Sequence, residues 1–357
     1  MSDPIRLQLL TLVAGKPLDL FASVFPATEF VFQKLRRGNG RQTETQPWRA
    51  FLSLVPVLLL TLGCGKAKEK IVSERYPNGQ LKFEIRFDTD RKVDDCEHWY
   101  ENGKKEATGR RMDGKPVGPW TFWHPNGEKR REANYKQGKL DGKVIDHHEN
   151  GKQASLSNYK QGVLHGPLSQ WSESGKKIAE ETYVDGKLEG KATYWYDNGE
   201  KQMEGSYQRG EQQGPWKYWH ENGKPESEGA YVAGLRQGSW TFWGRSGQKR
   251  REGAFKDDLA DGAWTSWHDN GQKGEEIHYV DGIQQGPYLR WNRSGRLVES
   301  GTYQEGELDG AITNWYDGGE RSVCEFHRGK LNGIRRYYDA NDQLLVEEEY
   351  KDGVQIR

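Results

Sequence analysis

The sequence predicts an all-β protein, an elongated antiparallel meander of stacked 24-residue β-hairpin repeats, and three observations support this fold class. A glycine recurs every 24 residues through most of the chain. Asn precedes most of these glycines, and Asn-Gly between two β-prone segments is a strong hairpin signal. No repeat has apolar residues at helical spacing over three turns, so no helix is expected there. The recurring glycines are Gly79, Gly103, Gly127, Gly151, Gly175, Gly199, Gly223, Gly247, Gly271, Gly295 and Gly319.

Aromatic columns and a glycine pair define the rest of each unit, where a column is the equivalent position in successive repeats. An indole lies four residues before the glycine in most units, and a Phe or Tyr ring lies eight residues after it. A Gly-x-x-x-Gly pair follows, as at Gly210 and Gly214. Each unit therefore predicts a Trp-containing strand, an Asn-Gly turn, a second strand ending on a ring, and a glycine-rich turn. The indoles are Trp99, Trp123, Trp171, Trp195, Trp219, Trp243, Trp267, Trp291 and Trp315.

This unit resembles the variant MORN repeat found in bacterial proteins named after the YwqK antitoxin. The resemblance covers residues 73–357, as an array of about 11 to 12 units. It implies a meander of stacked hairpins, in agreement with the turn chemistry. It also implies an antitoxin-like or immunity-like role, and MORN proteins are often described as scaffolds apposed to membranes.

The N-terminal segment has the pattern of a secretion signal. Residues 50–62 form an apolar run that is too short to span a bilayer comfortably, and arginines precede it. The run ends in Gly63-Cys64, which resembles a bacterial lipobox and implies a lipid on Cys64. We therefore divide this part into a leader and lipoprotein-type signal, 1–63, and a tether, 64–72. The alternative is a buried apolar stretch with an incidental cysteine, which would place the protein in the cytoplasm rather than the cell envelope.

Charge and cysteine content exclude several classes of function. The formal net charge is zero, which gives no support for nucleic-acid binding. Cys96 and Cys324 lie too many repeats apart to form a disulfide. No catalytic motif occurs, so we expect no enzyme, no catalytic residues and no cofactor.

Two polar columns invite a metal-site interpretation that their spacing does not support. The histidines of one column are His124, His148, His220 and His268. They lie one or more repeats apart, whereas metal ligands must surround a single point, so no metal site is expected. A second column holds Glu132, Glu180, Glu204, Glu228, Glu252 and Glu276. We expect these carboxylates to form cross-strand pairs with Lys or Arg.

The variability of the aromatic columns predicts which rings are buried. The nearly constant indole column predicts a core in which rings stack between repeats, with a stacking platform for sugars or bases as the alternative. The next column, through Phe122, exchanges rings for charges and lies on the other side of the sheet. We therefore expect Tyr194, Tyr218 and Phe242 to form an exposed candidate interaction surface. The alternative is that these rings merely cover a thin sheet.

These observations together predict a non-enzymatic, envelope-anchored repeat lipoprotein that acts as a protein-binding module. A toxin is one expected protein partner, and the membrane is contacted through the lipid at Cys64. The alternatives are a glycan- or cell-wall-binding surface lipoprotein and a membrane-apposed scaffold.

Overall fold

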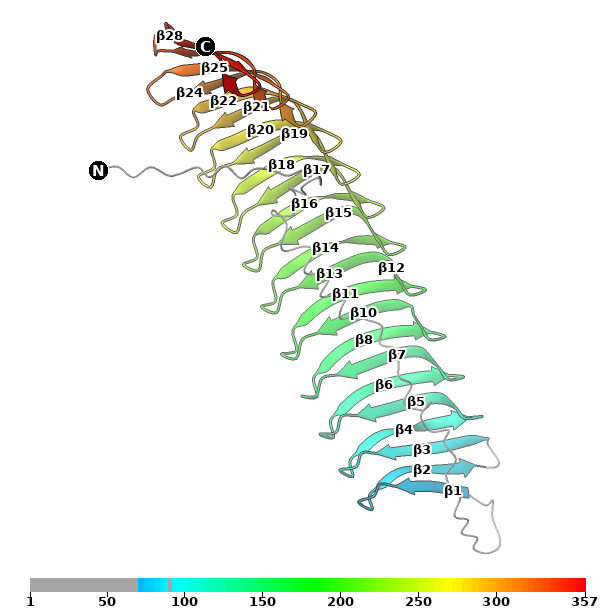
Figure 1. The fold of residues 1–357 in the computed structure, drawn as a ribbon. Coiled ribbons are helices and arrows are strands. Elements are labelled where there is room, and N and C mark those ends of the chain that lie inside the picture. Colours follow the sequence, from blue (N-terminus) through cyan, green and yellow to red (C-terminus); the bar gives the residue numbers. More distant parts are fainter. Residues whose placement is uncertain (1–69, 89–91) are drawn as a thin grey trace, which may run out of the picture. The chain divides into compact units, whose positions relative to one another are not determined.

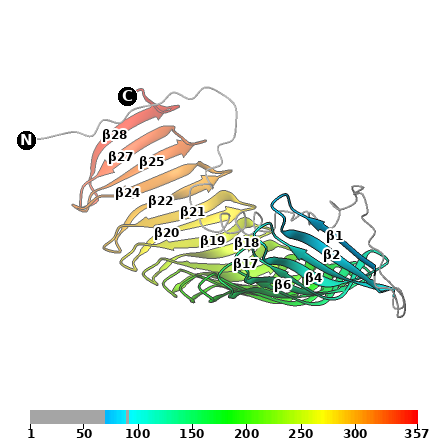
Figure 2. The same ribbon diagram turned by 90° about the horizontal axis from the view of Figure 1, so that it is seen from below.

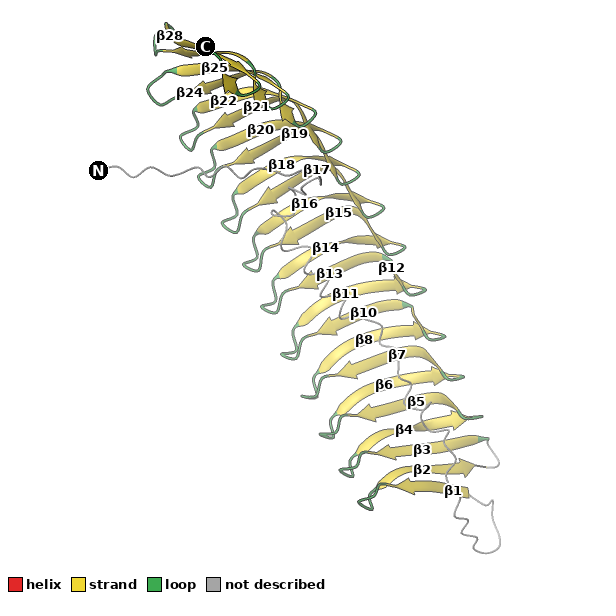
Figure 3. Ribbon diagram, viewed as in Figure 1, coloured by secondary structure: helices red, strands yellow, loops and turns green. Residues whose placement is uncertain are grey.

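The computed structural model describes residues 70–88 and 92–357, which form one antiparallel sheet of 29 strands (Figure 1). Strands pair with their neighbours in chain order, as β5 does with β6 and β6 with β7. This confirms the all-β meander predicted from the sequence. No helix occurs in these residues (Figure 3), and accordingly none of them belongs to a helix that could cross a bilayer. The predictions for residues 1–63 and Cys64 lie outside the described residues.

Most strands have six to nine residues, and five short strands have two. The first half of the sheet contains β1 (Lys70–Arg75), β2 (Leu81–Asp88), β3 (Val93–Trp99), β4 (Lys105–Met112), β5 (Lys115–Trp123), β6 (Lys129–Lys136), β7 (Lys139–His147), β8 (Gln153–Lys160), β9 (Val163–Leu164), β10 (Gly166–Trp171), β11 (Lys177–Val184), β12 (Lys187–Leu188), β13 (Gly190–Trp195) and β14 (Lys201–Gln208). The second half contains β15 (Glu211–Trp219), β16 (Pro225–Val232), β17 (Leu235–Trp243), β18 (Lys249–Lys256), β19 (Leu259–Trp267), β20 (Lys273–Val280), β21 (Ile283–Trp291), β22 (Leu297–Gln304), β23 (Glu307–Leu308), β24 (Gly310–Trp315), β25 (Arg321–His327), β26 (Lys330–Leu331), β27 (Gly333–Tyr338), β28 (Leu344–Lys351) and β29 (Val354–Gln355).

The sheet starts slightly earlier than the sequence predicted. β1 begins at Lys70 and pairs with β2, with Lys70 opposite Phe87. Residues 70–72 therefore belong to the sheet and not to the tether predicted for 64–72. Successive strands rotate relative to one another, so the sheet twists along its length (Figure 2).

The Asn-Gly turns lie where the sequence predicted them, but their geometry differs from the expected one. Gly79 has a φ of 87° and donates its N–H to the carbonyl of Tyr76, whereas Asn78 is not among the residues with positive φ. The asparagine acts through its side chain instead. Its Oδ1 accepts the N–H of Gln80, and its Nδ2 donates to the carbonyl of Glu101 in the next repeat, both at 2.9 Å. Each Asn therefore ties its own turn to the following one.

The second turns are the two-residue type in which both central residues have positive φ. Asp113 and Gly114 have φ values of 50° and 74°, and the flanking residues Met112 and Lys115 pair directly. Side chains tie these turns together as well. The Oε1 atom of Gln213 accepts the N–H of Ala233 in the next turn, at 3.0 Å. Side chain to backbone bonds thus connect neighbouring repeats at both ends of the strands.

A line of buried rings forms the centre of the array. Trp216 is fully buried, at 0% exposure, and its neighbour Tyr207 meets it edge to face with ring centroids 5.0 Å apart. Trp216 also stacks against Tyr218, which in turn lies 6.4 Å from Trp240. The rings continue in this way to Tyr279. Bulges in the long strands bend the sheet around these side chains.

This core corrects two predictions made from the sequence. The rings expected at an exposed interaction surface are part of the core, because Tyr194 and Tyr218 are only 4% and 6% exposed and Phe242 packs against the same cluster. The column expected to form the core, represented by Trp219, is only partly buried and points the other way. The buried indoles belong to a different column, three residues earlier in each strand: Trp120, Trp216, Trp240 and Trp264.

Candidate interaction face

The face of the sheet opposite the buried rings, called the outer face below, carries the regular indole column. Tyr218 points into the core, so its neighbour Trp219 points to the outer face, because side chains alternate along a strand. All nine indoles of this column are partly buried, neither enclosed nor fully exposed. The outer face therefore presents a row of partly exposed indole rings, one in most repeats, rather than a closed core.

A lysine and a glutamate accompany the indole in several repeats. Lys201 Nζ lies 5.6 Å from the ring centroid of Trp219 and 2.8 Å from Oε2 of Glu204. This lysine holds the pKa of Glu204 below its usual value. The same arrangement of lysine, indole and glutamate recurs at Lys249 and Lys273, and each Nζ atom lies 5.1 Å from an indole centroid. A lysine over an indole gains from the negative potential of the ring face.

The glutamate column is paired as predicted, but mostly along the strand and not across it. Lys129 pairs with Glu132, three residues later, and the same spacing recurs at Lys177, Lys201, Lys249 and Lys273. In a regular strand, residues three apart face opposite sides. Here Trp123 lies opposite Lys129 but Phe122 lies opposite Arg131, so β6 carries one extra residue, a bulge. This extra residue brings the lysine and the glutamate three positions later to the same face. Only Glu228 relies on a cross-strand partner, Lys217, at 3.6 Å.

The histidine column has a structural role that the sequence did not reveal. The Nε2 atom of His148 lies 2.8 Å from the carbonyl of Trp171, 23 residues later, and His268 contacts Trp291 in the same way. Tyr196 takes this position in another repeat and donates its hydroxyl to the carbonyl of Trp219. These bonds hold successive Trp strands together. Among residues 70–88 and 92–357, no three His, Cys, Asp or Glu side chains lie close enough to hold a metal ion.

Charged residues on the core face are paired across strands, which explains why the Phe122 column varies. Arg131 Nε lies 2.5 Å from Oδ1 of Asp146. Arg290 bonds to both Glu275 and Glu299, at 2.9 and 3.1 Å. A charge is tolerated beside the core when its partner neutralises it. Sequence reasoning considered each column alone and missed this compensation between neighbouring columns.

Two further features of the described residues are the buried cysteines and a hollow between turns. Cys96 and Cys324 are both free and buried, and burial raises the pKa of the Cys96 thiol to about 11.

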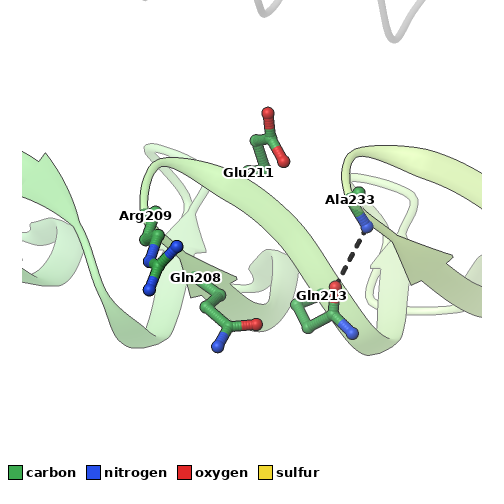
Figure 4. Close-up of a pocket in the computed structure, with 5 residues that line it drawn as sticks. All are labelled: Gln208, Arg209, Glu211, Gln213 and Ala233. Carbon is green, nitrogen blue, oxygen red and sulfur yellow. Dashed lines mark hydrogen bonds between the residues drawn. The ribbon is translucent and has the colours of Figure 1, made fainter.

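A hollow of about 260 Å³ lies between two neighbouring two-residue turns (Figure 4). Gln208, Arg209, Glu211, Gln213 and Ala233 line it. The Gln213 carbonyl that could anchor a ligand there already accepts the Ala233 N–H.

Comparison with known families agrees with this geometry. The model of the MORN repeat variant matches six segments, which are residues 68–88, 116–137, 188–209, 212–233, 260–281 and 331–352. The chain carries variant MORN repeats. Each match covers one strand, the turn after it and the strand that follows, so each MORN repeat is one hairpin of the sheet. None of the curated proteins compared with the chain matches it.

Proposed function

We propose that this MORN-repeat chain is a non-enzymatic binding module that captures a protein partner on its outer face. The observation that carries the proposal is the row of partly exposed indoles, several of them beside a lysine–glutamate pair, as at Trp219, Lys201 and Glu204. Partly exposed aromatic rings interleaved with charges are the usual composition of a recognition surface. The hydrogen bonds between repeats keep this surface preformed, which lowers the entropic cost of binding.

The N-terminal segment adds a cellular setting to the proposal. A lipid on Cys64 would hold the array at the bacterial cell envelope, where a partner arriving from outside meets the outer face. The resemblance to YwqK antitoxin proteins makes a toxin one candidate partner, in an immunity-like role. Treatment with globomycin and labelled palmitate tests the anchor, since wild type should take up label and Cys64→Ser should not. Unlabelled wild type would remove the envelope part of the proposal and leave the binding part intact.

A glycan is the second candidate ligand, because the same indoles are regularly spaced and rings of this kind stack on sugars.

An anionic bilayer is less favoured as the direct contact. The outer face carries lysines and glutamates as pairs, as at Lys249 and Glu252, and attraction to anionic lipids needs an excess of basic groups.

The test compares wild type with the double variant Trp219→Leu/Trp243→Leu, which keeps apolar volume but removes two outer indoles. Both proteins are expressed at native level in the source cell, cross-linked and captured, and the partners are identified by mass spectrometry. Loss of one defined protein partner from the variant supports the proposal. Equal capture by both proteins contradicts it, and quenching of wild-type Trp fluorescence by cell-wall glycan favours the glycan alternative.

The matched control is Trp216→Leu, which changes a buried indole on the opposite face. It should lower stability without selectively removing the partner. A circular dichroism melt of each variant separates loss of the surface from loss of the fold.

A further inference from the structure

A second surface lies at the other end of the strands, beside the two-residue turns. Five apolar side chains on three consecutive turns are 42–53% exposed there, and we call them the rim patch. They are Val232, Leu235, Leu259, Val280 and Ile283. Leu235 and Trp243 are the two ends of β17, so the rim patch is separated from the outer indole row by the length of a strand.

The rim patch is continuous and not a set of scattered residues. Val232 pairs directly with Leu235, and Val280 pairs with Ile283. Successive turns are joined by backbone hydrogen bonds, such as Gly282 N–H to the carbonyl of Ala260 at 2.8 Å. Leu259 leans over the next turn, with Cδ2 only 3.3 Å from where a Cβ on Gly282 would lie. A contiguous exposed apolar patch of this kind is typical of an interaction site.

Carboxylates outnumber basic groups on the turns of the rim patch and on the turn that follows it. The four turns from 232 to 307 carry five acidic residues against one lysine, Lys256. Lys256 is itself engaged, with Nζ 3.5 Å from Oδ1 of Asp281. The acidic residues are Asp257, Asp258, Asp281, Glu305 and Glu307. Asp258 is bound by Arg236 at 2.8 Å, and the other four are exposed.

The same turn positions earlier in the array have the opposite charge. The turns between 136 and 187 carry Lys136, Lys139, Lys160 and Lys187 against Asp185. They also hold two exposed apolar residues, Val163 and Val184. The repeat geometry is therefore the same at both places, while the larger apolar patch and the acidic border are found at the rim patch and not at these earlier turns.

We propose that the rim patch docks a basic amphipathic segment of a partner protein. Apolar side chains of that segment would cover the five exposed residues, while its Lys or Arg side chains would meet the bordering carboxylates. A bilayer is a poorer fit, because the negative lipid surface would be repelled by the same carboxylates. The rim patch does not include the outer indoles, so this proposal can be tested independently of the function proposed for them.

The test uses the full chain and three probes. The first is a peptide with Leu and Lys at the spacing of an amphipathic helix, the second has Glu in place of Lys, and the third is vesicles of phosphatidylcholine and phosphatidylglycerol. We expect saturable binding of the Leu/Lys peptide at one site, weakened by added salt, and no comparable binding of the other two.

Two variants locate the binding site, and a third is the matched control. Leu235→Ser/Leu259→Ser/Ile283→Ser should weaken Leu/Lys peptide binding about tenfold or more. Asp257→Asn/Asp281→Asn should weaken it and reduce its salt dependence. Val163→Ser/Val184→Ser changes the same turn positions within the basic part of the array and should leave binding unchanged.

Several outcomes would overturn the assignment. These are equal binding of the Leu/Glu peptide, preferential binding of the vesicles, wild-type affinity in the triple variant, or an equal loss in the control variant. The three apolar side chains changed in the triple variant are exposed, as are Asp257 and Asp281, so the melts of the variants should match wild type within a few degrees. A variant that unfolds would place these side chains in the core and would also contradict the proposal.

Discussion

The indole of Trp216 lies flat against the backbone of Gly205, so that a Cβ atom on this glycine would overlap the ring. The ring is held there by its Nε1–H, which donates to the carbonyl of Ser206 at 3.2 Å. The same relationship recurs wherever this column holds Trp, in the pairs Gly109–Trp120, Gly229–Trp240 and Gly253–Trp264. Where the column holds the smaller Val144, the glycine position holds Ala133. In these repeats a larger side chain of one column lies against a smaller residue of the other.

This match predicts that Gly205→Ala destabilises the protein, because the new methyl group must displace a fully buried ring. Overpacking of this kind costs about 1–3 kcal/mol in the free energy of unfolding. Adding Trp216→Val recreates the Ala133–Val144 pair already present in the chain, so the double variant should be more stable than the sum of the single changes implies. Urea unfolding measures the coupling, with Ser206→Ala as the control. Strict additivity would mean that the two positions do not share one packing site.

The two indole columns should respond differently to truncation. Trp216→Ala removes a fully buried ring and should cost about 3–5 kcal/mol, whereas the partly exposed Trp219 should cost clearly less. Lys224→Ala, at an exposed position, should change stability by no more than about 0.5 kcal/mol. Urea melts of the three variants give the order. An equal loss from the two Trp variants would show that the outer indoles contribute to the core as much as the inner ones.

The sequence predicted the repeat period, the hairpins and the positions of both turns, because glycine and asparagine at fixed intervals allow few alternatives. It did not predict which rings are buried. The regular indole column is nearly constant, which predicts packing, yet these rings lie on the outer face, where bulges and, in several repeats, a lysine accompany them. The buried columns vary because neighbours compensate, as Ala133 does for Val144 and Asp146 for Arg131.

The turn geometry shows a similar limit of sequence reasoning. Asn before Gly suits a turn in which both residues have positive φ, and it also suits a turn in which the Asn side chain bonds to nearby backbone. In this chain Asn78 is not among the residues with positive φ and its Oδ1 accepts the Gln80 N–H, which is the second type of turn. Its Nδ2 also contacts Glu101 in the next repeat. That contact depends on how repeats stack, which the local pattern does not contain.

His98 predicts a pH dependence of stability near the start of the array. Burial, with a smaller effect of Arg111, lowers the pKa of His98 to about 4, from an ordinary value near 6.5. As the pH falls below about 6.5, the unfolded chain binds a proton that the folded chain excludes, so the free energy of unfolding falls until about pH 4. His98→Phe introduces the ring found at Phe122 in the same column and should remove this part of the loss.

The measurement compares wild type and His98→Phe by urea unfolding at pH 7 and pH 5. Wild type should lose about 1–2 kcal/mol more than the variant over this range. Other histidines are common to both proteins and cancel in the difference. Parallel losses would show that His98 takes up its proton as readily in the folded chain as in the unfolded one.

The repeat organisation itself predicts how the chain tolerates deletions. Removing residues 184–207 joins Tyr183 to Gln208. Gln208 then takes the place of Val184, because the two residues directly precede equivalent turn positions, Arg209 and Asp185. The turn, its paired strands and the contacts between neighbours are then all restored with one hairpin fewer, because each MORN repeat contacts mainly its neighbours. Removing 12 residues instead, 184–195, deletes one turn and the Trp-containing strand β13. β14 then follows β11 and lies where a Trp-containing strand belongs, so core and outer faces no longer align. Circular dichroism and limited proteolysis should find the first deletion folded and the second unfolded. If both deletions were folded, or both unfolded, the result would contradict the stacked-hairpin organisation.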